Sequence, residues 1–517
     1  MQNEHPVIVI GGGIAGLSAA LSLSEVGLAP LLLERDPQGF GGRVSAKPSI
    51  DFVHAGKTWH FSMEHGIHGW WNAYRNFLDL LARDGLEDRL VPAQDQTLVY
   101  FSGDDAHRIH VGRRTQQTRM PAPLHHLPLM WDPRFVARLR LREWQDLYKV
   151  LARLLETLRL DPLNQLDRAR YDSMGSDAYA RELPDIVASL MLCLTRAGFF
   201  ADAHDVSLLA FLQSLQYYVF LHKSYQSFSF CRGPIVPTLM QPLREALERQ
   251  GGEVRLGWSV RQVQREDDRT WRVQARAGRR TVTLRSQALV LALDMPGAQQ
   301  LCETSPDLRQ VYGDLSPFKA RPSGIIRHFW PGQPRDTATC GVIAGAGNTG
   351  DAYFWLDQFQ GEFAAWRYQT GGSVSEVHVY NLDLLQSATD TELARGVERD
   401  LRKAFPSLGQ PVHVAVVRNA ATNSCFAPGT IARQAAVATK YSNLALCGDW
   451  IDPGCLSFFM ERACLTGLQA ANVMRTWHGK PPAHVHLFSP PAQHVQWIQR
   501  SLRWMPRILP MKTARSA

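Results

Sequence analysis

The chain has 517 residues, of which 45% are hydrophobic and 20% are charged. This length predicts two or three domains, and the ordinary composition excludes disorder, collagen and coiled coil. Lys and Arg outnumber Asp and Glu by 56 to 48, a mild excess that bears on partners and not on fold.

Several classes of protein are disfavoured by what the sequence lacks. No nucleic-acid-binding module is recognisable, so we expect no nucleic-acid partner. The eight cysteines are scattered without C-x-x-C pairs, which argues against a metal site and indicates a reduced intracellular chain. No cleavable signal and no run of about 18 apolar residues is present. We therefore expect a cytoplasmic protein, either soluble or bound to the inner face of the membrane.

The first nucleotide signal is a strand, a glycine turn and a helix. A β-branched strand over Pro6–Ile10 precedes the turn, and helical periodicity follows over residues 17–26. Such glycines permit a tight turn, close approach of the backbone to a pyrophosphate, and packing of helix on strand, while the helix N-terminus attracts phosphate. The motif G-x-G-x-x-G comprises Gly11, Gly12, Gly13, Ile14, Ala15 and Gly16.

A second apolar run ends in Glu34, which is followed by Arg35. An acid at this spacing is placed to accept hydrogen bonds from ribose hydroxyls. With the strand before the turn and the helix after it, the pattern predicts dinucleotide binding. The alternative is a purely structural strand–turn–helix.

A second glycine pair narrows the choice of dinucleotide. Gly41, Gly42 and Arg43 follow the acid. Here the sequence resembles the FAD-dependent amine oxidase and phytoene desaturase superfamily, in which such a segment lies beside the flavin. The resemblance implies FAD as cofactor, with close backbone approach at the glycines and Arg43 as a fixed cation near the pyrophosphate. A solvated surface arginine is the alternative.

The far end of the chain is similar to the closing FAD motif of the same superfamily. A strand ends at Gly448 and Asp449, and a helix with small residues begins near Met460 and Glu461. The resemblance implies that Asp449 binds the ribityl chain and that the helix N-terminus faces the flavin N1–C2=O edge. A positive helix end stabilises the anionic reduced flavin.

A middle segment is expected to return to the nucleotide domain. Residues 234–249 are typical of a helix, and short strands follow, with the backbone of Val260 implied to contact adenine. The fold class is thus α/β, a discontinuous Rossmann-like FAD-binding domain with an inserted α+β substrate domain. We expect FAD-binding parts at 1–95, 234–300 and 431–480, a helical substrate- or membrane-facing part at 96–233, a substrate-domain sheet at 301–430 and a basic aromatic tail at 481–517.

Two further segments resemble the isorenieratene-synthase-like branch of carotenoid desaturases. One runs from Glu64 to Trp71 and the other is Phe-Phe-Ala-Asp at 199–202. The resemblance covers about residues 6–475 and departs at Ile67 and Trp70–Trp71, where that branch usually has phenylalanines. It implies that the Gly66–His68 stretch passes the isoalloxazine.

His68 is our candidate catalytic residue, because a histidine there could shuttle a proton or hydrogen-bond the flavin. A structural hydrogen-bonding role is the alternative. The aromatic residues nearby fit either a lipid tunnel or ordinary core. These are Trp70, Trp71, Phe199 and Phe200.

Two stretches suggest contact with a bilayer. Residues 134–160 have a basic amphipathic helical pattern, and residues 495–505 interleave arginines with tryptophans. Such stretches suit an anionic interface, with Trp at the headgroup level and Arg on phosphates. A solvated helix and a core-docked tail are the alternative.

The leading hypothesis is an FAD-dependent oxidoreductase acting on a hydrophobic lipid. Carotenoid or isoprenoid desaturation, isomerisation or ring aromatisation would proceed by hydride transfer to flavin, with a quinone or oxygen as electron acceptor. A second hypothesis is oxidation of a fatty acyl chain or an amine, for which Lys319 is the one lysine we suggest near the flavin. A third is a non-catalytic FAD-bound lipid carrier. The sequence does not determine the oligomeric state.

Overall fold

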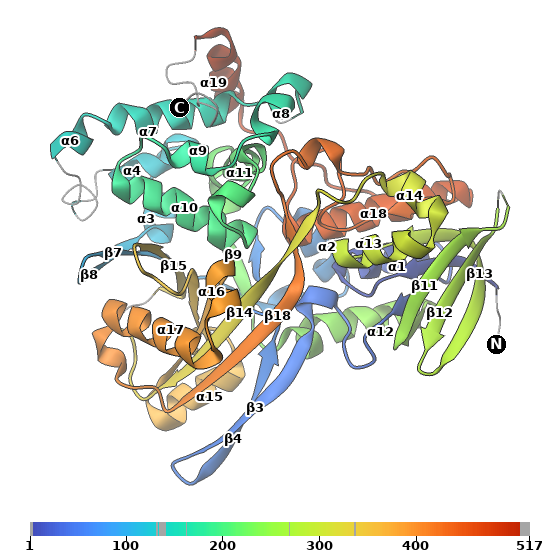
Figure 1. Ribbon diagram of the computed structural model, residues 1–517, viewed down its shortest axis with the longest axis horizontal. Coiled ribbons are helices and arrows are strands. Elements are labelled where there is room, and N and C mark those ends of the chain that lie inside the picture. Colours follow the sequence, from blue (N-terminus) through green and yellow to red (C-terminus); the bar gives the residue numbers. More distant parts are fainter. Residues whose placement is uncertain are drawn as a thin grey trace.

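The computed structural model describes residues 4–130, 133, 141–161, 163–267, 269–335 and 338–506. One β-sheet lies at the end of the molecule that carries the N-terminus, and a second sheet lies at the other end beside a layer of helices (Figure 1). Helices cover both sheets, which confirms the expected α/β class with an inserted α+β part.

The first sheet joins strands that are far apart in the sequence. Strand β1 lies between β2 and β13 and is parallel to both, and β19 pairs parallel with β13 through Leu289 and Leu444. β12 and β11 extend the sheet in antiparallel fashion. The strands are β1 (Glu4–Ile10), β2 (Leu31–Glu34), β10 (Glu253–Leu256), β11 (Trp258–Arg265), β12 (Trp271–Ala277), β13 (Arg280–Leu291) and β19 (Leu444–Leu446).

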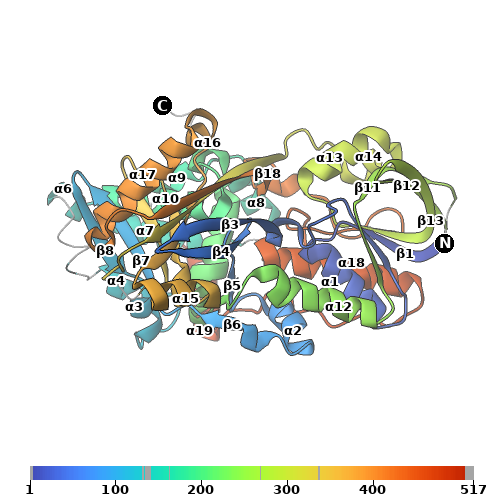
Figure 2. The same ribbon diagram turned by 90° about the horizontal axis from the view of Figure 1, so that it is seen from below.

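Helices α1 (Ile14–Ser24) and α18 (Phe459–Trp477) pack side by side against this sheet (Figure 2). Glycine makes this packing possible. A Cβ on Gly16 would lie 1.9 Å from the carbonyl oxygen of Gly11, and a Cβ on Gly467 would lie 2.3 Å from that of Ala15. The first and last helices of the nucleotide-binding part are therefore in backbone contact.

The second sheet has the order β18-β14-β17-β16-β15-β7-β8. Its β7 and β8 come from residues 96–110, within the segment expected to be helical. Helix α17 (Asp390–Ala404) covers the sheet and begins where Thr389 and Glu392 form a capping box. The strands are β7 (Gln96–Ser102), β8 (Asp105–His110), β14 (Lys319–Trp330), β15 (Cys340–Gly345), β16 (Ala352–Trp355), β17 (Ser373–Val379) and β18 (His413–Cys425).

The remaining strands and helices pack on the two sheets, form the helical layer or connect the sheets. The strands are β3 (Ala46–His54), β4 (Lys57–Glu64), β5 (Gly69–Trp71), β6 (Leu90–Pro92) and β9 (Phe228–Cys231). The helices are α2 (Arg75–Arg83), α3 (Gly112–Gln117), α4 (Leu127–Met130), α6 (Leu141–Trp144), α7 (Leu147–Arg159), α8 (Gln165–Asp172), α9 (Asp177–Ala180), α10 (Asp185–Phe199), α11 (Leu208–Ser214), α12 (Gln241–Arg249), α13 (Met295–Thr304), α14 (Pro306–Tyr312), α15 (Gly361–Thr370), α16 (Leu382–Ser387) and α19 (Gln493–Trp504).

The two stretches expected at a membrane meet in the helical layer. Residues 141–160 form α6 and α7 instead of one continuous helix, and residues 134–140 lie outside the described residues. Helix α19 packs on α7, with Val495 fully buried. Among the described residues, no helix is both long and apolar enough to cross a bilayer.

Candidate functional site

The glycine turn after β1 is fixed by the acid at the end of β2. Glu34 accepts hydrogen bonds from the backbone N–H of Gly12 at 2.8 Å and of Asp36 at 2.9 Å. Burial of the carboxyl raises its pKa, although these bonds oppose that shift. Helix α1 begins after Gly13, and no side chain of the described chain caps it. Its first N–H groups are therefore available to a phosphate. Ribose binding by Glu34 stays a prediction.

An ion pair joins the first and last of the segments predicted to bind FAD. The Arg43 guanidinium lies 2.7 Å from Asp449, whose carboxyl is almost fully buried and also accepts a hydrogen bond from Ser424 at 3.0 Å. The backbone N–H of Gly41 donates to the carbonyl of Gly12 at 2.9 Å, so the second glycine pair lies against the first turn. The structure thus brings together the residues predicted to hold pyrophosphate and ribityl chain.

Helix α18 follows Asp449 in the sequence, and one of its side chains binds the turn that carries Asp449. The backbone N–H of Gly448 donates to the Thr466 hydroxyl at 2.9 Å, which fixes the turn that carries Asp449. Met460 is partly exposed in the first helical turn. No side chain within the described residues caps the helix at Phe458, so its N–H groups also point to an open end.

Glu461 lies in the same turn and is bound by the start of α2. Its carboxylate accepts hydrogen bonds from the backbone N–H and side chain of Asn76, at 2.9 and 2.7 Å, and from the backbone N–H of Phe77. Burial raises its pKa to about 7, against the effect of these bonds. Glu461 therefore joins α18 to α2.

The Gly66–His68 stretch approaches the second sheet closely. Gly66 has φ +150°, and a Cβ there would lie 3.0 Å from Ile325 and 3.2 Å from His378. The backbone N–H of Ile67 donates to Glu376 at 2.8 Å. The absence of a side chain on Gly66 thus lets the stretch lie directly on β14 and β17.

His68 has an unsatisfied nitrogen in this position. Its Nδ1 is buried without a hydrogen-bond partner among the described residues. Burial, and then the charges of His378 and Arg43, lower its pKa to about 4, so the ring is neutral at pH 7. An unpartnered buried nitrogen that feels the charge of Arg43 fits a bound group with polar edges. The catalytic role of His68 stays a prediction.

The structure adds a row of polar residues that sequence reasoning missed. Glu376 and His378 lie on β17 and Tyr380 follows it, and on the neighbouring strand Arg327 pairs with Glu376 in register. The alternation E-V-H-V-Y was the available signal, since alternate residues of a strand share one face. Arg327 bonds to Glu376 at 2.5 Å, and His378 contacts Glu376 at 2.8 Å and Tyr380 at 2.7 Å.

Three other predicted residues lie outside these contacts. Arg35 is largely exposed and forms an ion pair with Asp294 at 3.1 Å. Val260 is half-buried on β11, where it pairs with Ala275 beside an irregularity in the register. Lys319, suggested for amine oxidation, is exposed at the first position of β14. The proposed contact of Val260 with adenine stays a prediction.

The aromatic residues of the two branch segments differ in burial. Trp70 and Phe199 are buried core residues, whereas Trp71 and Phe200 are partly exposed. Trp71 and Phe200 belong to a closed series of aromatic rings, which we name the aromatic circuit. The centroids of neighbouring rings in this series lie 4.5–6.1 Å apart. In order, its members are Phe200, Tyr380, His378, Phe354, Phe230, Phe228, Trp71, Tyr218, Phe458 and Phe459.

Residues 14–475 match the family described as flavin containing amine oxidoreductase. The chain belongs to this family. It is an FAD-dependent oxidoreductase. Three features of the structure fit FAD: the glycine turn, the Arg43–Asp449 pair and the open helix N-termini.

Comparison with individual proteins refines this placement. The chain is 27% identical over 489 residues to carotenoid phi-ring synthase of Streptomyces griseus, covering 90% of this chain and 87% of that one. It is 25% identical over 267 residues to 15-cis-phytoene desaturase of Solanum lycopersicum, covering 51% of this chain and 42% of that one.

Among solved structures, cyclohexylamine oxidase from Brevibacterium oxydans IH-35A matches with a TM-score of 0.64 at 17% identity, covering 92% of this chain and all of that chain. Putrescine oxidase bound to putrescine matches with a TM-score of 0.62 at 14% identity, covering 91% of this chain and 99% of that one. At this identity, the likeness establishes the fold alone.

Proposed function

We propose that this oxidoreductase acts on a carotenoid or another isoprenoid, by desaturation, isomerisation or ring aromatisation. The aromatic circuit is the observation that carries the proposal. It joins the Gly66–His68 region, through His378, to the start of α18, through Phe459. A polyene is a long apolar molecule with extended π faces. The four partly exposed members of the circuit, Trp71, Phe200, Phe354 and Phe459, offer it ring surface without charge. The similarity to carotenoid phi-ring synthase over most of both chains supports the same substrate class.

The polar groups of the site fit this substrate better than they fit a cationic amine. The buried carboxylate of Glu376 is already neutralised by Arg327 at 2.5 Å, and it also accepts bonds from His378 and Ile67. A protonated amine placed there would compete with an arginine already in position. Oxidation of an amine or a fatty acyl chain is therefore the competing function to be tested.

The test is anaerobic reduction of the purified, FAD-loaded protein. β-Carotene and phytoene in detergent micelles, a medium-chain fatty acyl ester and cyclohexylamine would each be added, and bleaching of the flavin absorbance followed. We expect bleaching by a carotenoid, with product masses lower by two or four hydrogens for desaturation or aromatisation. A redox-neutral isomerisation would instead give a product of unchanged mass on incubation with reduced FAD. Bleaching by the amine alone would contradict the proposal.

Reoxidation in the same apparatus identifies the electron acceptor. The reduced protein would be mixed separately with oxygen and with a soluble quinone, the two acceptors we propose. The faster reoxidation identifies the acceptor, and failure of both excludes this pair.

We also propose that the protein draws its substrate from an anionic membrane surface. On α19, Trp497, Arg500 and Trp504 have the i, i+3, i+7 spacing of one helix face, and the two tryptophans are 69% and 91% exposed. On the adjoining α7, Tyr148 and Leu151 are also exposed. Exposed aromatic side chains beside arginines suit a bilayer interface.

A further inference from the structure

The hydrogen bonds around His378 specify where its proton lies. Burial alone would raise the pKa of Glu376, but the Arg327 charge and the bond from His378 lower it to about 2, so the carboxylate is ionised and only accepts. At 2.8 Å from that carboxylate, His378 Nε2 must carry a hydrogen. In the neutral ring Nδ1 is then an acceptor, and the Tyr380 hydroxyl at 2.7 Å donates to it.

Tyr380 is placed between the segments predicted to flank the flavin. Its ring lies 5.1 Å from that of Phe200, which lies 5.6 Å from Phe459 at the start of α18. On the other side, its partner His378 lies against Gly66. Tyr380 thus brings a hydroxyl between the two segments, with His378 as the partner of that hydroxyl.

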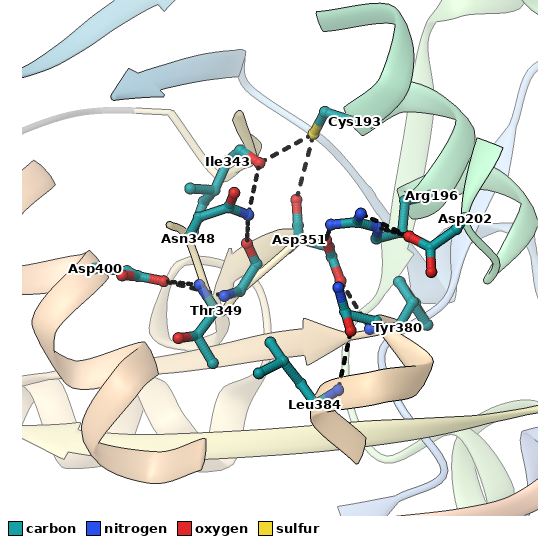
Figure 3. A network of polar contacts seen from close by, with 12 residues as sticks. Cys193, Arg196, Asp202, Ile343, Asn348, Thr349, Asp351, Tyr380, Leu384 and Asp400 are labelled. Atoms are coloured by element: carbon teal, nitrogen blue, oxygen red, sulfur yellow. Dashed lines mark hydrogen bonds and ion pairs between the residues drawn. The ribbon is translucent and has the colours of Figure 1, made fainter. Parts of the chain in front are cut away.

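A separate polar network holds the backbone of Tyr380 (Figure 3). The Tyr380 backbone N–H donates to Asp351 at 2.7 Å, and Asp351 also contacts Arg196 at 3.4 Å. Arg196 is paired with Asp202 at 2.6 Å. Asp202 and Phe200 both belong to the Phe-Phe-Ala-Asp segment. That segment therefore positions Tyr380 twice, through its ring and through its backbone.

We infer that Tyr380 is the proton acceptor of the reaction, with His378 and Glu376 as positioning residues that receive and stabilise the proton. This inference rests on the proposed function. It assigns the acid–base role to Tyr380 instead of His68.

A C–C single bond that becomes a double bond loses a hydride and a proton, and FAD supplies the hydride acceptor. The substrate C–H proton moves to the Tyr380 oxygen while the phenol proton moves to His378 Nδ1. Tyr380 ends neutral, and His378 ends as an imidazolium beside the ionised Glu376. That charge is released when His378 later returns its proton to solvent.

The experiment compares Tyr380→Phe and His378→Gln with wild type as FAD-loaded full chains. Tyr179→Phe is the matched control, because Tyr179 is also buried and its hydroxyl also has one side-chain partner, Thr157, but it lies in the helical layer. His68→Gln tests the rival base. β-Carotene and phytoene serve as probes, and anaerobic flavin reduction is measured in H₂O and in D₂O.

We expect Tyr380→Phe and His378→Gln to slow flavin reduction by about 100-fold or more, the usual contribution of a general base, and to abolish the solvent isotope effect. FAD content and probe binding should stay at the wild-type level, and Tyr179→Phe should reduce within about 2-fold of wild type. Reduction by Tyr380→Phe within about 3-fold of wild type overturns the inference, as does a loss confined to His68→Gln. Loss of FAD from both Tyr380→Phe and His378→Gln also overturns it, because the residues are then structural.

A spectroscopic measurement separates this inference from the proposed function. In chain labelled with ¹⁵N-histidine, the signal missing from His378→Gln identifies the ring. We expect the Nε2–H tautomer in wild type and a changed Nδ1 shift in Tyr380→Phe. If no carotenoid reduces the wild-type flavin and none is isomerised on incubation with the reduced protein, the proposed function fails. An unchanged Nδ1 shift independently refutes the hydrogen-bonded arrangement.

Discussion

Arg43 and Asp449 form an ion pair at 2.7 Å that connects the first of the predicted FAD-binding segments to the last. Asp449 is nearly fully buried, whereas Arg43 keeps about a quarter of its side chain exposed. The Ser424 hydroxyl gives the carboxylate a further hydrogen bond from the end of β18, so the second sheet is also tied to this point. The residues predicted to hold the flavin are therefore kept together by contacts between distant segments.

Replacement of Arg43 tests this connection. Arg43→Met leaves a buried carboxylate without its cation. We expect the free energy of unfolding to fall by about 1–3 kcal/mol, between the values for exposed and fully buried ion pairs. FAD retention after gel filtration should fall several-fold. Arg35→Met is the control, since Arg35 also pairs with an aspartate but is 57% exposed, and it should change stability by less than about 1 kcal/mol. Thermal unfolding and flavin absorbance measure the two effects, and equal behaviour of the variants would contradict the prediction.

The contact between α1 and α18 gives a second prediction. Gly467→Ala places a methyl group 2.3 Å from the Ala15 carbonyl oxygen. Because this overpacks the contact, we expect the free energy of unfolding to fall by about 1–3 kcal/mol. Gly198→Ala is the matched control, because Gly198 lies within α10 and has no atom within 4 Å of an added Cβ. That variant should be neutral or about 0.5–1 kcal/mol more stable, as alanine favours helix. Chemical denaturation of both variants and of wild type measures these changes in the free energy of unfolding.

Glu64 provides a prediction on pH. Burial raises its pKa from 4.5 to about 8, so the folded protein holds a proton that the unfolded chain releases above pH 4.5. The corresponding stability is complete below pH 4.5 and is lost as pH rises to 8. Glu64→Gln does not titrate and keeps an oxygen to accept the Ile235 N–H. Its stability relative to wild type should rise by about 1 kcal/mol or more between pH 5 and pH 8.

Melting temperatures measured across this pH range provide the check. Glu245→Gln, which changes an exposed carboxylate, should show the wild-type pH dependence. A constant difference between Glu64→Gln and wild type would show that Glu64 is ionised throughout.

The proposed membrane surface predicts a loss of vesicle binding. Substitution of Trp497 and Trp504 by serine removes two exposed aromatic side chains from α19, and co-sedimentation with vesicles rich in phosphatidylglycerol should weaken by about 10-fold or more. Tyr368→Ser, at a 91% exposed position on α15, is the control and should bind as wild type does. Equal binding by all three proteins would locate any membrane contact elsewhere.

The sequence was informative where the pattern is local. The strand, glycine turn and helix from residue 4 to residue 24 follow from spacing alone, because the chemistry of the turn requires glycine at fixed positions. The later Gly448–Asp449 turn was located by resemblance to a family whose model matches residues 14–475.

What sequence reasoning missed depends on contacts between distant segments. Glu376 pairs with Arg327 and His378 lies against Gly66, and these two partners belong to other segments of the chain. The polar strand β8 was assigned to a helical region because it lies at a sheet edge, where alternation is weak. Trp70 and Trp71 are adjacent, and only the strand β5 determines that one is core while the other joins the aromatic circuit.

The late position of β19 has a consequence for biosynthesis. Its partner β13 is complete by Leu291, but Leu444–Leu446 leave the ribosome only after most of the chain has been translated. At about 5–20 residues per second, this leaves the edge of β13 unpaired for roughly 10–30 s. Since Asp449 comes after β19 in the sequence, the ion pair between Arg43 and Asp449 cannot form in a nascent chain during that interval.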